Sequence, residues 1–523
     1  MMDRKPLADT AFSGLCSASG AKALDEEASA WGLNPFSLVE AAGRACAKVF
    51  SGTYLQDKRK RSIAVFAGKG NNAADALVML KALILEGYAQ APACSVLIPH
   101  IPDLSSSETK TPFSEAMLAV RKLGVPVLTW EAGIDPSVFA KTDVIIDGIN
   151  GTGLIGPLRS IAMEMAGMIN SLRSGGPFVV SVDVPSGNFD GWQSGMPIIA
   201  ADATLALEPQ KICLYFPAAR PFAGAILPVG GIFPPALIDK HREAELAGWE
   251  AASAKIPPIP KTAYKYERGL VEIMAGSSGS AGAARLAALG AQSAGAGLVR
   301  LIVDPSLYPV AASGCSGIMV VPDGSAPGET AENSRFSPNA ALLGPGWGRG
   351  EDRMRLLESY LPREKQGIPL ILDADAILLA KDIVFNGNVL ITPHPGEFAA
   401  YTGISKKEIL ACPIPVLRHF AAIKKVYILL KSHVLYAACP NGRIGVIDGM
   451  NPLIAAGGSG DVLAGFCAAI AARQGRFDGY ACACAAASLL IQAAETEGIK
   501  GAFVDPSELA RAASAIAGAA WLP

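Results

Sequence analysis

Short apolar segments that end in aspartate or glycine alternate with longer helical patterns along this chain. Residues 62–67 form one such segment, which precedes Gly68-Lys-Gly70 and a helical pattern from about 73 to 86, while residues 144–147 and 178–183 each end in an aspartate. Strands that alternate with helices predict a parallel, doubly wound sheet. Ligands of such sheets bind beyond the carboxyl ends of the strands, which is where the glycine-rich segments of this chain fall.

A proline-rich stretch separates two such series of strands and helices. Pro234-Pro235, a polar run at 239–245 and the prolines between 257 and 260 have the composition of a linker. The expected strands of the second series lie at 270–274, 298–303, 369–372, 389–392 and 426–431. Asn441-Gly442 between two apolar runs predicts a β-hairpin. We therefore expect two α/β domains, a Rossmann-like doubly wound domain at 1–245 and a second domain at 246–523.

The composition excludes several classes of protein. Half of the 523 residues are hydrophobic and 18% are charged, which argues against disorder, and a net charge of −2 offers no positive field for nucleic acid or an anionic membrane. No apolar run reaches the length of about 18 residues that a membrane helix needs, and no signal peptide is visible. The 10 cysteines have no metal-binding spacing. We expect a soluble, cytoplasmic homo-oligomer with reduced cysteines and no nucleic-acid or membrane partner.

A glycine-rich turn ending in a carboxylate, Gly457-Gly-Ser-Gly-Asp461, is followed at once by an apolar, alanine-rich run from 462 to 472. This pattern predicts a loop that opens into a helix, where free N–H groups and the positive end of the helix dipole bind phosphate. An acid inside an anion site is unfavourable unless it takes part in the chemistry. We therefore interpret Asp461 as a base that accepts a proton from a hydroxyl while the amides hold a phosphoryl group. The alternative is an ordinary helix cap.

Four further segments follow expected strands of the same half. They are the glycine-rich residues 275–285 and 344–348, residues 370–376 with Asp373 and Asp375, and residues 391–397 with His394 and Glu397. Each alone has a simpler explanation as turn glycines, a helix cap or a surface histidine. Together with the Asp461 turn, all lying at strand ends of one domain, they favour a shared ligand site.

The order of motifs in the second half is specific. T-P-H-P-G-E at 392–397, L-L-K at 429–431 and G-G-S-G-D-V-L-A-G at 457–465 resemble the ADP/ATP-dependent NAD(P)H-hydrate dehydratases of the ribokinase-like superfamily, and the resemblance covers about residues 262–515. It implies a ribokinase-like α/β/α fold and a repair reaction. In that reaction ADP, giving AMP and phosphate, or ATP drives the removal of water from the S form of hydrated NADH or NADPH.

Roles for residues of the second half follow from this resemblance. Asp461 would be the base and a substrate contact, and Mg²⁺ would accompany the nucleotide phosphates. The other contacts with the hydrated dinucleotide would be Ala283, Gly346 and His394. The adenine nucleotide would be held by Lys431, Ser432, His433, Gly458, Ser459 and Gly460.

The first half resembles the NAD(P)H-hydrate epimerases, which are commonly fused ahead of the dehydratase. The motifs are G-K-G-N-N-A-A-D at 68–75, D-G-I-N-G-T-G-L-I-G-P-L at 147–158 and S-V-D-V-P-S-G at 181–187, and the resemblance spans about 15–230. It implies that Asp183 is the acid–base residue and that K⁺ is held by Asn72, Asp147 and Ser186. The residues implied to contact the substrate, besides Asp183, are Asn71, Asn72, Asp75, Gly151, Thr152, Gly153 and Pro157.

Alanines stand at positions 73, 74 and 76, where the epimerases have glycines. Two interpretations follow. The loop is already the first turn of a helix, which alanine favours, or the extra methyl groups partly fill the pocket. In the second case the first half would be a structural or oligomerisation domain that retains only the fold.

The leading hypothesis is therefore a bifunctional enzyme that repairs hydrated NADH and NADPH, the species NADHX and NADPHX. The alternative is a small-molecule kinase of the ribokinase-like superfamily with a non-catalytic N-terminal domain for binding or oligomerisation, whose phosphorylated product would be stable. A Rossmann oxidoreductase is disfavoured, because Ala73 replaces the third glycine of a dinucleotide-binding fingerprint.

Overall fold

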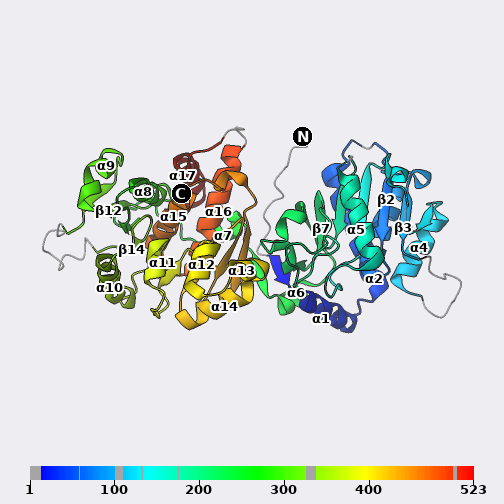
Figure 1. Ribbon diagram of the computed structural model, residues 1–523, viewed down its shortest axis with the longest axis horizontal. Coiled ribbons are helices and arrows are strands. Elements are labelled where there is room, and N and C mark those ends of the chain that lie inside the picture. Colours follow the sequence, from blue (N-terminus) through cyan, green and yellow to red (C-terminus); the bar gives the residue numbers. More distant parts are fainter. Residues whose placement is uncertain are drawn as a thin grey trace. The chain divides into compact units, whose positions relative to one another are not determined.

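The computed structural model of the chain describes residues 13–57, 59–100, 110–130, 134–174, 176–324, 337–498 and 503–523. These residues form two compact units, Gly14–Ala244 and Glu245–Pro523, each built on its own sheet. In Figure 1 the chain colours run from blue to green through the first unit and from green to red through the second. In the part of the chain that is described, no helix is long and apolar enough to cross a membrane.

The first unit contains a seven-stranded parallel sheet with the order β4-β3-β2-β5-β6-β7-β9. Its strands are β2 (Ile63–Ala67), β3 (Ser95–Ile98), β4 (Val127–Thr129), β5 (Val144–Gly148), β6 (Phe178–Val182), β7 (Ala203–Leu207) and β9 (Ala225–Val229). Outside this sheet, β1 (Ser13–Cys16) pairs in parallel with β8 (Gln210–Lys211). The strands expected at 62–67, 144–147 and 178–183 are confirmed to within one residue.

Helices cover both faces of this sheet, as a doubly wound fold requires. They are α1 (Ala18–Ala28), α2 (Pro35–Tyr54), α3 (Asn71–Leu85), α4 (Pro112–Lys122), α5 (Ser160–Arg173) and α6 (Pro235–His241). Neighbouring residues of β2 face opposite cores, since Val65 packs in the cluster that contains Leu77 of α3, whereas Phe66 packs with Met165 of α5. Apolar burial on both faces explains why the central strands are hydrophobic throughout.

The second unit has a sheet with the order β13-β12-β11-β14-β15-β16-β17-β18-β19-β10. Its strands are β10 (Ala244–Leu246), β11 (Leu270–Met274), β12 (Leu298–Val303), β13 (Met319–Pro322), β14 (Ala340–Leu343), β15 (Leu370–Leu372), β16 (Val389–Ile391), β17 (Tyr427–Leu430), β18 (Val434–Ala438) and β19 (Ile444–Asp448). The predicted hairpin at Asn441-Gly442 is confirmed, because β18 and β19 pair antiparallel around a turn in which Gly442 has φ 90°.

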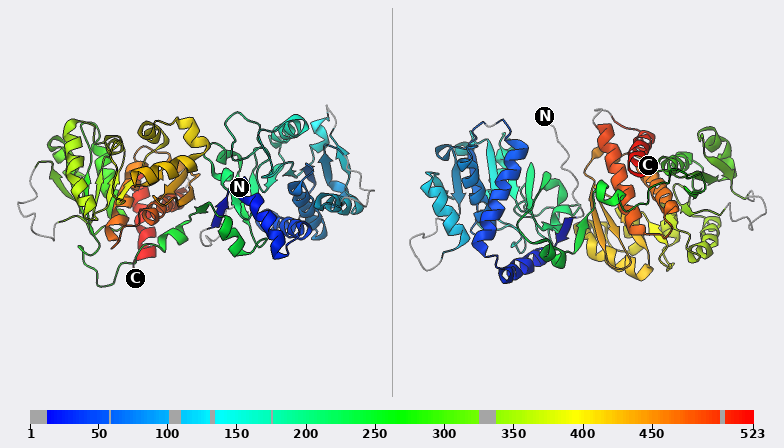
Figure 2. Two further views of the ribbon diagram at one scale, coloured as in Figure 1. Left: turned by 90° about the horizontal axis from the view of Figure 1, so that it is seen from below. Right: turned by 180° about the vertical axis from the view of Figure 1, so that it is seen from behind.

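Helices also form layers on the two faces of the second sheet. They are α7 (Trp249–Ser253), α8 (Ala281–Ser293), α9 (Tyr308–Ser313), α10 (Glu351–Lys365), α11 (Asp375–Leu379), α12 (Pro395–Thr402), α13 (Lys406–Ala411), α14 (Pro413–Lys424), α15 (Ser459–Arg473), α16 (Gly479–Gly498) and α17 (Pro506–Trp521). The alanine-rich helices α8, α15, α16 and α17 share one large core. Figures 1 and 2 show α11, α12 and α14 on the opposite side of the sheet.

The proline-rich stretch that the sequence suggests is a linker contains the boundary between the two units, but much of it is regular structure. It includes α6, β10 and α7, whereas the prolines between 257 and 260 lie outside any helix or strand. Glu245 of β10 forms an ion pair with Arg443 at 2.7 Å, and Trp249 of α7 packs on Trp521 with ring centroids 5.6 Å apart. These contacts fix a segment whose composition resembles a linker, which is why composition alone was misleading here.

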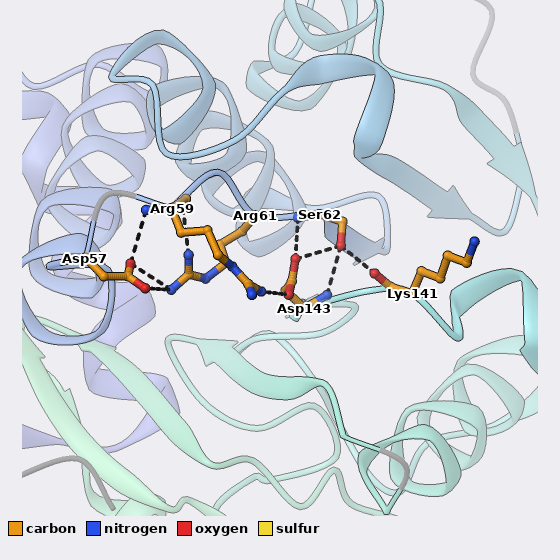
Figure 3. Close-up of polar contacts among 6 residues, drawn as sticks. All are labelled: Asp57, Arg59, Arg61, Ser62, Lys141 and Asp143. Carbon is orange, nitrogen blue, oxygen red and sulfur yellow. Dashed lines mark hydrogen bonds and ion pairs between the residues drawn. The ribbon is translucent and has the colours of Figure 1, made fainter.

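A polar cluster joins the amino ends of β2 and β5, the end of the sheet opposite the glycine-rich segments (Figure 3). The backbone N–H and the hydroxyl of Ser62 both donate to Asp143 Oδ2, at 2.8 and 2.9 Å, and Arg59 pairs with the other carboxylate oxygen. Arg61 Nη2 donates to both carboxylate oxygens of Asp57, each at 2.8 Å. The pKa of Asp143 is lowered, because these hydrogen bonds and arginines outweigh its partial burial.

We predict that Asp143→Ala loosens the amino ends of β2 and β5. The change leaves the Ser62 N–H without its acceptor, a loss of about 1–2 kcal/mol. Hydrogen–deuterium exchange of peptides that cover β2 and β5 should be faster in the variant, whereas the control Asp57→Ala should have a smaller effect, because Asp57 is largely exposed. Because the pKa of Asp143 is lowered on folding, its contribution should be present at neutral pH and lost as the pH falls through the carboxyl range. Equal exchange in wild type and Asp143→Ala would contradict this role.

Candidate active sites

The glycine turn of the second unit opens directly into α15, which begins at Ser459. Gly458 has φ 103°, and a Cβ atom added there would lie 2.5 Å from Leu286, so both the backbone and the space require glycine. Asp461 lies in the first turn, where backbone N–H groups have no intrahelical acceptor. The predicted loop-to-helix transition is therefore confirmed.

Asp461 lies in an unusual electrostatic environment. Its pKa is raised to about 6 by burial and by the nearby carboxylates of Asp373 and Glu397, while Lys431 opposes the shift. A carboxylate with a pKa near neutrality is suited to accept and release a proton at physiological pH. The surroundings of Asp461 are therefore compatible with the predicted role as a base.

Lys431 connects Asp461 to a second, deeply buried acid. Its Nζ lies 2.5 Å from Asp373 Oδ1, which also accepts a 2.7 Å hydrogen bond from the Thr392 hydroxyl. A Cβ added at Gly460 would lie 3.5 Å from the same Nζ, so the ammonium adjoins the start of α15. Burial alone would lower the pKa of Lys431, but the surrounding carboxylates outweigh it and raise the pKa. The lysine therefore stays charged beside the predicted phosphate site.

Of the residues expected to contact the dinucleotide in this unit, Ala283 and Gly346 are neighbours in the structure. Gly346 has φ 56°, and a Cβ atom added there would lie 3.1 Å from Ala283 Cβ, so these two residues are neighbours. The Ser277 hydroxyl donates to the Gly346 carbonyl at 2.8 Å and fixes this approach. Asp375 accepts from the Gly348 N–H at 2.8 Å, which anchors the same loop from the other side.

His394 caps helix α12 and is mostly exposed. Its Nδ1 accepts hydrogen bonds from the N–H groups of Gly396 and Glu397 at 2.9 and 3.2 Å, and Glu397 Oε2 accepts from the His394 N–H at 2.8 Å. The simpler explanation of a helix cap is thus correct for Nδ1, while Nε2 lies 3.4 Å from Glu397 Oε1. Ser432 and His433 form the turn between β17 and β18, where the Ser432 hydroxyl donates to the Val434 carbonyl.

The first unit contains a cavity of about 780 Å³ beyond the carboxyl ends of its strands. Most residues implied to contact the substrate line it: Asn71, Asn72, Asp75, Gly151, Thr152, Gly153 and Asp183. Pro157 is not among the lining residues that the structure describes. Both amide atoms of Asn72 and one oxygen each of Asp75 and Asn150 are buried without a hydrogen-bond partner in the described part of the chain. Buried polar atoms rarely stay unpaired, so this wall is built to receive a polar ligand.

Asp183 is held in a strained backbone conformation at the end of β6. Its φ is 67°, in the left-handed region that costs a non-glycine residue about 1 kcal/mol. One carboxylate oxygen, Oδ1, forms an ion pair with Lys211 Nζ at 2.7 Å, and the other, Oδ2, accepts from the Thr152 hydroxyl at 3.3 Å. A Cβ added at Gly151 would lie 3.1 Å from Asn72 and 3.3 Å from Asp183 Oδ2, so the three residues converge.

The three residues implied to hold K⁺ differ in how they are used. Asp147 is fully buried and accepts hydrogen bonds from the Ser186 hydroxyl at 2.5 Å, the Ser186 N–H at 2.9 Å and the Ser181 hydroxyl at 2.8 Å. Burial nevertheless raises the pKa of Asp147. The orphaned Asn72 oxygen suits a hard cation, whereas the Asp147 and Ser186 oxygens already bond each other. Amide, carboxylate and hydroxyl oxygens fit K⁺. Among the described residues, the Asn72 amide oxygen is the one of these three ligands that has no hydrogen-bond partner.

The alanines at 73, 74 and 76 do not fill the cavity. Helix α3 begins at Asn71, and these three methyl groups are fully buried in the core of the unit instead of lining the cavity. Ala76 Cβ lies 2.6 Å from where a Cβ of Gly148 would be, so it packs under the end of β5. The structure therefore favours the first interpretation, in which the segment is already a helical turn.

The places of Lys211, Asp25 and Thr392 in the two sites were not predicted from the sequence. Lys211 and Asp25 both line the cavity of the first unit, and Thr392 hydrogen-bonds the buried Asp373. A signal existed for Lys211, because a lysine that directly precedes the apolar run 212–216 is unusual. Its pairing with Asp183, 28 positions earlier, depends on the tertiary fold.

Comparisons with known proteins agree with both halves of the chain. The profile of the NAD(P)H-hydrate dehydratase family matches residues 271–514, and that of the YjeF-related protein N-terminus matches residues 35–213. A solved structure of an ADP/ATP-dependent NAD(P)H-hydrate dehydratase from Bacillus subtilis, co-crystallised with ATP and Mg²⁺, is 26% identical, and the match covers 52% of this chain and 97% of that one with a TM-score of 0.46.

Full-length relatives carry the same pair of domains. The chain is 32% identical over 490 residues to a bifunctional NAD(P)H-hydrate repair enzyme of Gloeobacter violaceus, covering 88% of this chain and 90% of the relative. It is 30% identical over 437 residues to the corresponding enzyme of a Synechocystis species, covering 80% of this chain and 78% of the relative. Identity at this level across both halves shows that the chain belongs to the family of bifunctional NAD(P)H-hydrate repair enzymes.

Proposed function

We propose that this protein repairs hydrated NADH and NADPH with two active sites on one chain. Residues 246–523 remove water from the S form in an ADP-dependent reaction that yields AMP and phosphate, and residues 1–245 interconvert the R and S epimers. The observation that carries the dehydratase proposal is Asp461, a half-buried carboxylate with a pKa of about 6 in the first turn of α15. Family membership across the whole chain supports this pairing of activities over a lone small-molecule kinase.

The dehydratase step uses the amides and charges around Asp461. Asp461 accepts the proton of the ring hydroxyl as that oxygen takes the terminal phosphoryl group of ADP, and AMP leaves. Phosphate then leaves the ring carbon with its bonding electrons, and the adjacent ring carbon gives up a proton, so that the double bond of the dihydronicotinamide is restored. Lys431 and the N–H groups at Gly458 and Gly460 stabilise charge on the transferred group, while Ser459, whose N–H donates to the Ala456 carbonyl, lies between these two glycines. Mg²⁺, which phosphate oxygens and water bind well, would neutralise further charge on the nucleotide.

The nucleotide and the hydrated ring approach Asp461 from different elements. We assign Lys431, Ser432 and His433, at the end of β17, to the nucleotide side. Ala283 and Gly346, which pack closely together, are assigned to the substrate side. We assign His394, at the start of α12, to the same side, with Nε2 as the ring nitrogen that does not cap the helix. ADP is the expected donor, and ATP is the alternative that the same site would accept.

The epimerase site is the cavity of the first unit. Asp183 acts as the acid–base residue on the hydrated nicotinamide, with its Oδ2 facing the loop of Gly151, Thr152 and Gly153. That loop, which continues to Pro157, and Asn71, Asn72 and Asp75 hold the rest of the dinucleotide. K⁺ would be held by Asn72, Asp147 and Ser186, where it would supply positive charge for the substrate phosphates. Action in the cytoplasm as a homo-oligomer remains a prediction from composition.

Asp461→Asn should retain nucleotide binding and lose dehydratase turnover by at least about 100-fold, because the amide cannot accept the proton. Turnover is measured as recovery of nicotinamide absorbance from the pure S epimer, and ADP binding by calorimetry. Asp382→Asn, on the exposed surface of the same unit, is the matched control and should behave as wild type. Near-normal turnover of Asp461→Asn would rule out the assigned base.

The dehydratase should depend on pH with an acid limb near 6. Because the pKa of Asp461 is raised to about 6, the carboxylate is a competent base above that pH and is progressively protonated below it. The value of kcat/KM for the S epimer should therefore fall about tenfold per pH unit below 6 and level off above 7. An acid limb near pH 4, typical of an exposed aspartate, would contradict this environment.

Asp183→Ala should abolish epimerisation, with a loss of at least about 100-fold, and leave dehydration of the S epimer intact. Epimerisation is followed by chromatography of R and S forms without nucleotide, so that only the first site acts. Asp135→Ala, an exposed change in the same unit, serves as the control. If Asp183→Ala still equilibrates the epimers faster than buffer alone, the acid–base role belongs to another residue.

A further inference from the structure

Lys211 is a buried cation in the epimerase cavity that the proposed function leaves without a role. It lies in β8, its residue exposure is 5%, and it lines the cavity beside Asp183. Its Nζ lies 2.7 Å from Asp183 Oδ1 and donates to the Leu207 carbonyl at 3.2 Å. Lysines are rarely buried this completely unless a partner requires their charge.

The ion pair with Asp183 is the main interaction that keeps Lys211 charged. Burial alone would lower the pKa of Lys211, but the nearby acidic groups, Asp183 above all, outweigh burial and raise the pKa, so the ammonium is protonated. Burial raises the pKa of the Cys16 thiol, on the neighbouring strand β1, to about 12. Burial also raises the pKa of Asp25 on α1 and, well above its usual range, that of Asp75 on α3. Cys16 is therefore neutral, and Asp75 favours its neutral form.

The two oxygens of Asp183 face different surroundings. Oδ1 is turned to Lys211, whereas Oδ2 faces Thr152, Gly151 and Asn72, the side where the substrate loop lies. Lys22 and Lys69, the other lysines that line the cavity, have exposed side chains and lie on α1 and before α3. Lys211 is thus the buried cation of this wall within the described residues.

We propose that Lys211 is a positioning residue of the epimerase, which holds Asp183 Oδ1 so that the carboxylate presents only Oδ2 to the substrate. The inference rests on the proposed acid–base role of Asp183. It also accounts for the strained backbone at Asp183, since the ion pair fixes the side chain in the one direction that serves both Lys211 and the cavity.

The test compares three variants of the full-length chain, each of which retains the unchanged dehydratase unit. Lys211→Met removes the charge, and Lys211→Arg keeps it. Lys48→Met, a change of an exposed lysine on α2 that does not line the cavity, is the control. Epimerisation of R and S forms is measured from pH 5 to 9, and dehydration of the pure S epimer in the same preparations reports the integrity of the second unit. Hydrogen–deuterium exchange of β6 and β8 reports local folding.

Lys211→Met should lose at least about tenfold in epimerase kcat, with a smaller change in KM. The acid limb of its pH–rate profile should move to higher pH by about one unit or more. The reason is that an opposite charge within ion-pair distance favours the ionised form of a carboxyl group by at least about one pKa unit. Lys211→Arg should restore the pH profile and part of the rate. A normal rate in Lys211→Met, or a loss with an unchanged pH profile that Lys211→Arg does not rescue, would overturn the proposal. If Lys211→Met does not fold, Lys211→Gln is judged by the same criteria.

The variants distinguish an error in the role of Lys211 from an error in the role of Asp183. If Asp183→Ala retains epimerisation, the assignment of the acid–base residue is wrong, and the role of Lys211 falls with it. If Asp183→Ala is inactive but Lys211→Met behaves as wild type, Asp183 acts without Lys211. The two sets of variants therefore separate the claims.

Discussion

An ion pair between a lysine and a carboxylate buried at the carboxyl end of a sheet strand is the interaction on which both sites depend. Removing such an ion from water costs on the order of several kcal/mol unless a close partner compensates. The first unit pairs Asp183 with Lys211 at 2.7 Å and the second pairs Asp373 with Lys431 at 2.5 Å. All four residues are largely shielded from solvent. Each pair therefore fixes a charge where the topology of a parallel sheet places a ligand.

The two pairs are used in different ways. In the first unit the paired carboxylate itself lines the cavity, so the lysine contacts the proposed acid–base residue directly. In the second unit the paired carboxylate is the supporting residue, and its lysine adjoins Gly460 and lowers the pKa of Asp461, against the stronger effects of burial and the nearby acids. Backbone strain accompanies both arrangements, at Asp183 with φ 67° and at Ala374 with φ 46°. Ala374 turns the chain so that Asp373 reaches Lys431 while Asp375 reaches the Gly348 N–H.

Much of this architecture could be predicted from the sequence, because its signals are local. Apolar segments that end in aspartate or glycine gave the strands to within a residue or so, and the Asn441-Gly442 turn gave the hairpin. The same logic placed Asp461 at the start of a helix. What could not be predicted depends on contacts between distant residues. Lys211 and Asp183 meet only when β8 lies beside β1 and the end of β6, and the segment that resembles a linker is ordered by Arg443 and Trp521.

The role of the alanines near Asn72 also depends on the three-dimensional structure and could not be predicted from the sequence. From the sequence, a methyl group in place of a glycine hydrogen suggests either a helical turn or a filled pocket. The structure places the three methyl groups in the core, behind the wall that carries Asn72 and Asp75. The cavity has a volume of about 780 Å³, and among the described residues polar atoms of Asn72 and Asp75 in its wall have no hydrogen-bond partner. The substitutions therefore affect the packing of α3 and leave the ligand side intact.

The most direct measurement follows a mixed pool of R and S NADH hydrate with ADP and Mg²⁺, in parallel with ATP, and with and without K⁺. Recovery of the nicotinamide absorbance of the whole pool at the enzymatic rate is the expected result, because epimerisation would feed the dehydratase. Rapid recovery of one epimer's share, with the rest following at the spontaneous rate, would mean that the cavity around Asp183 and Lys211 is not a working epimerase. Absence of recovery with either nucleotide would contradict the account of Asp461 as well.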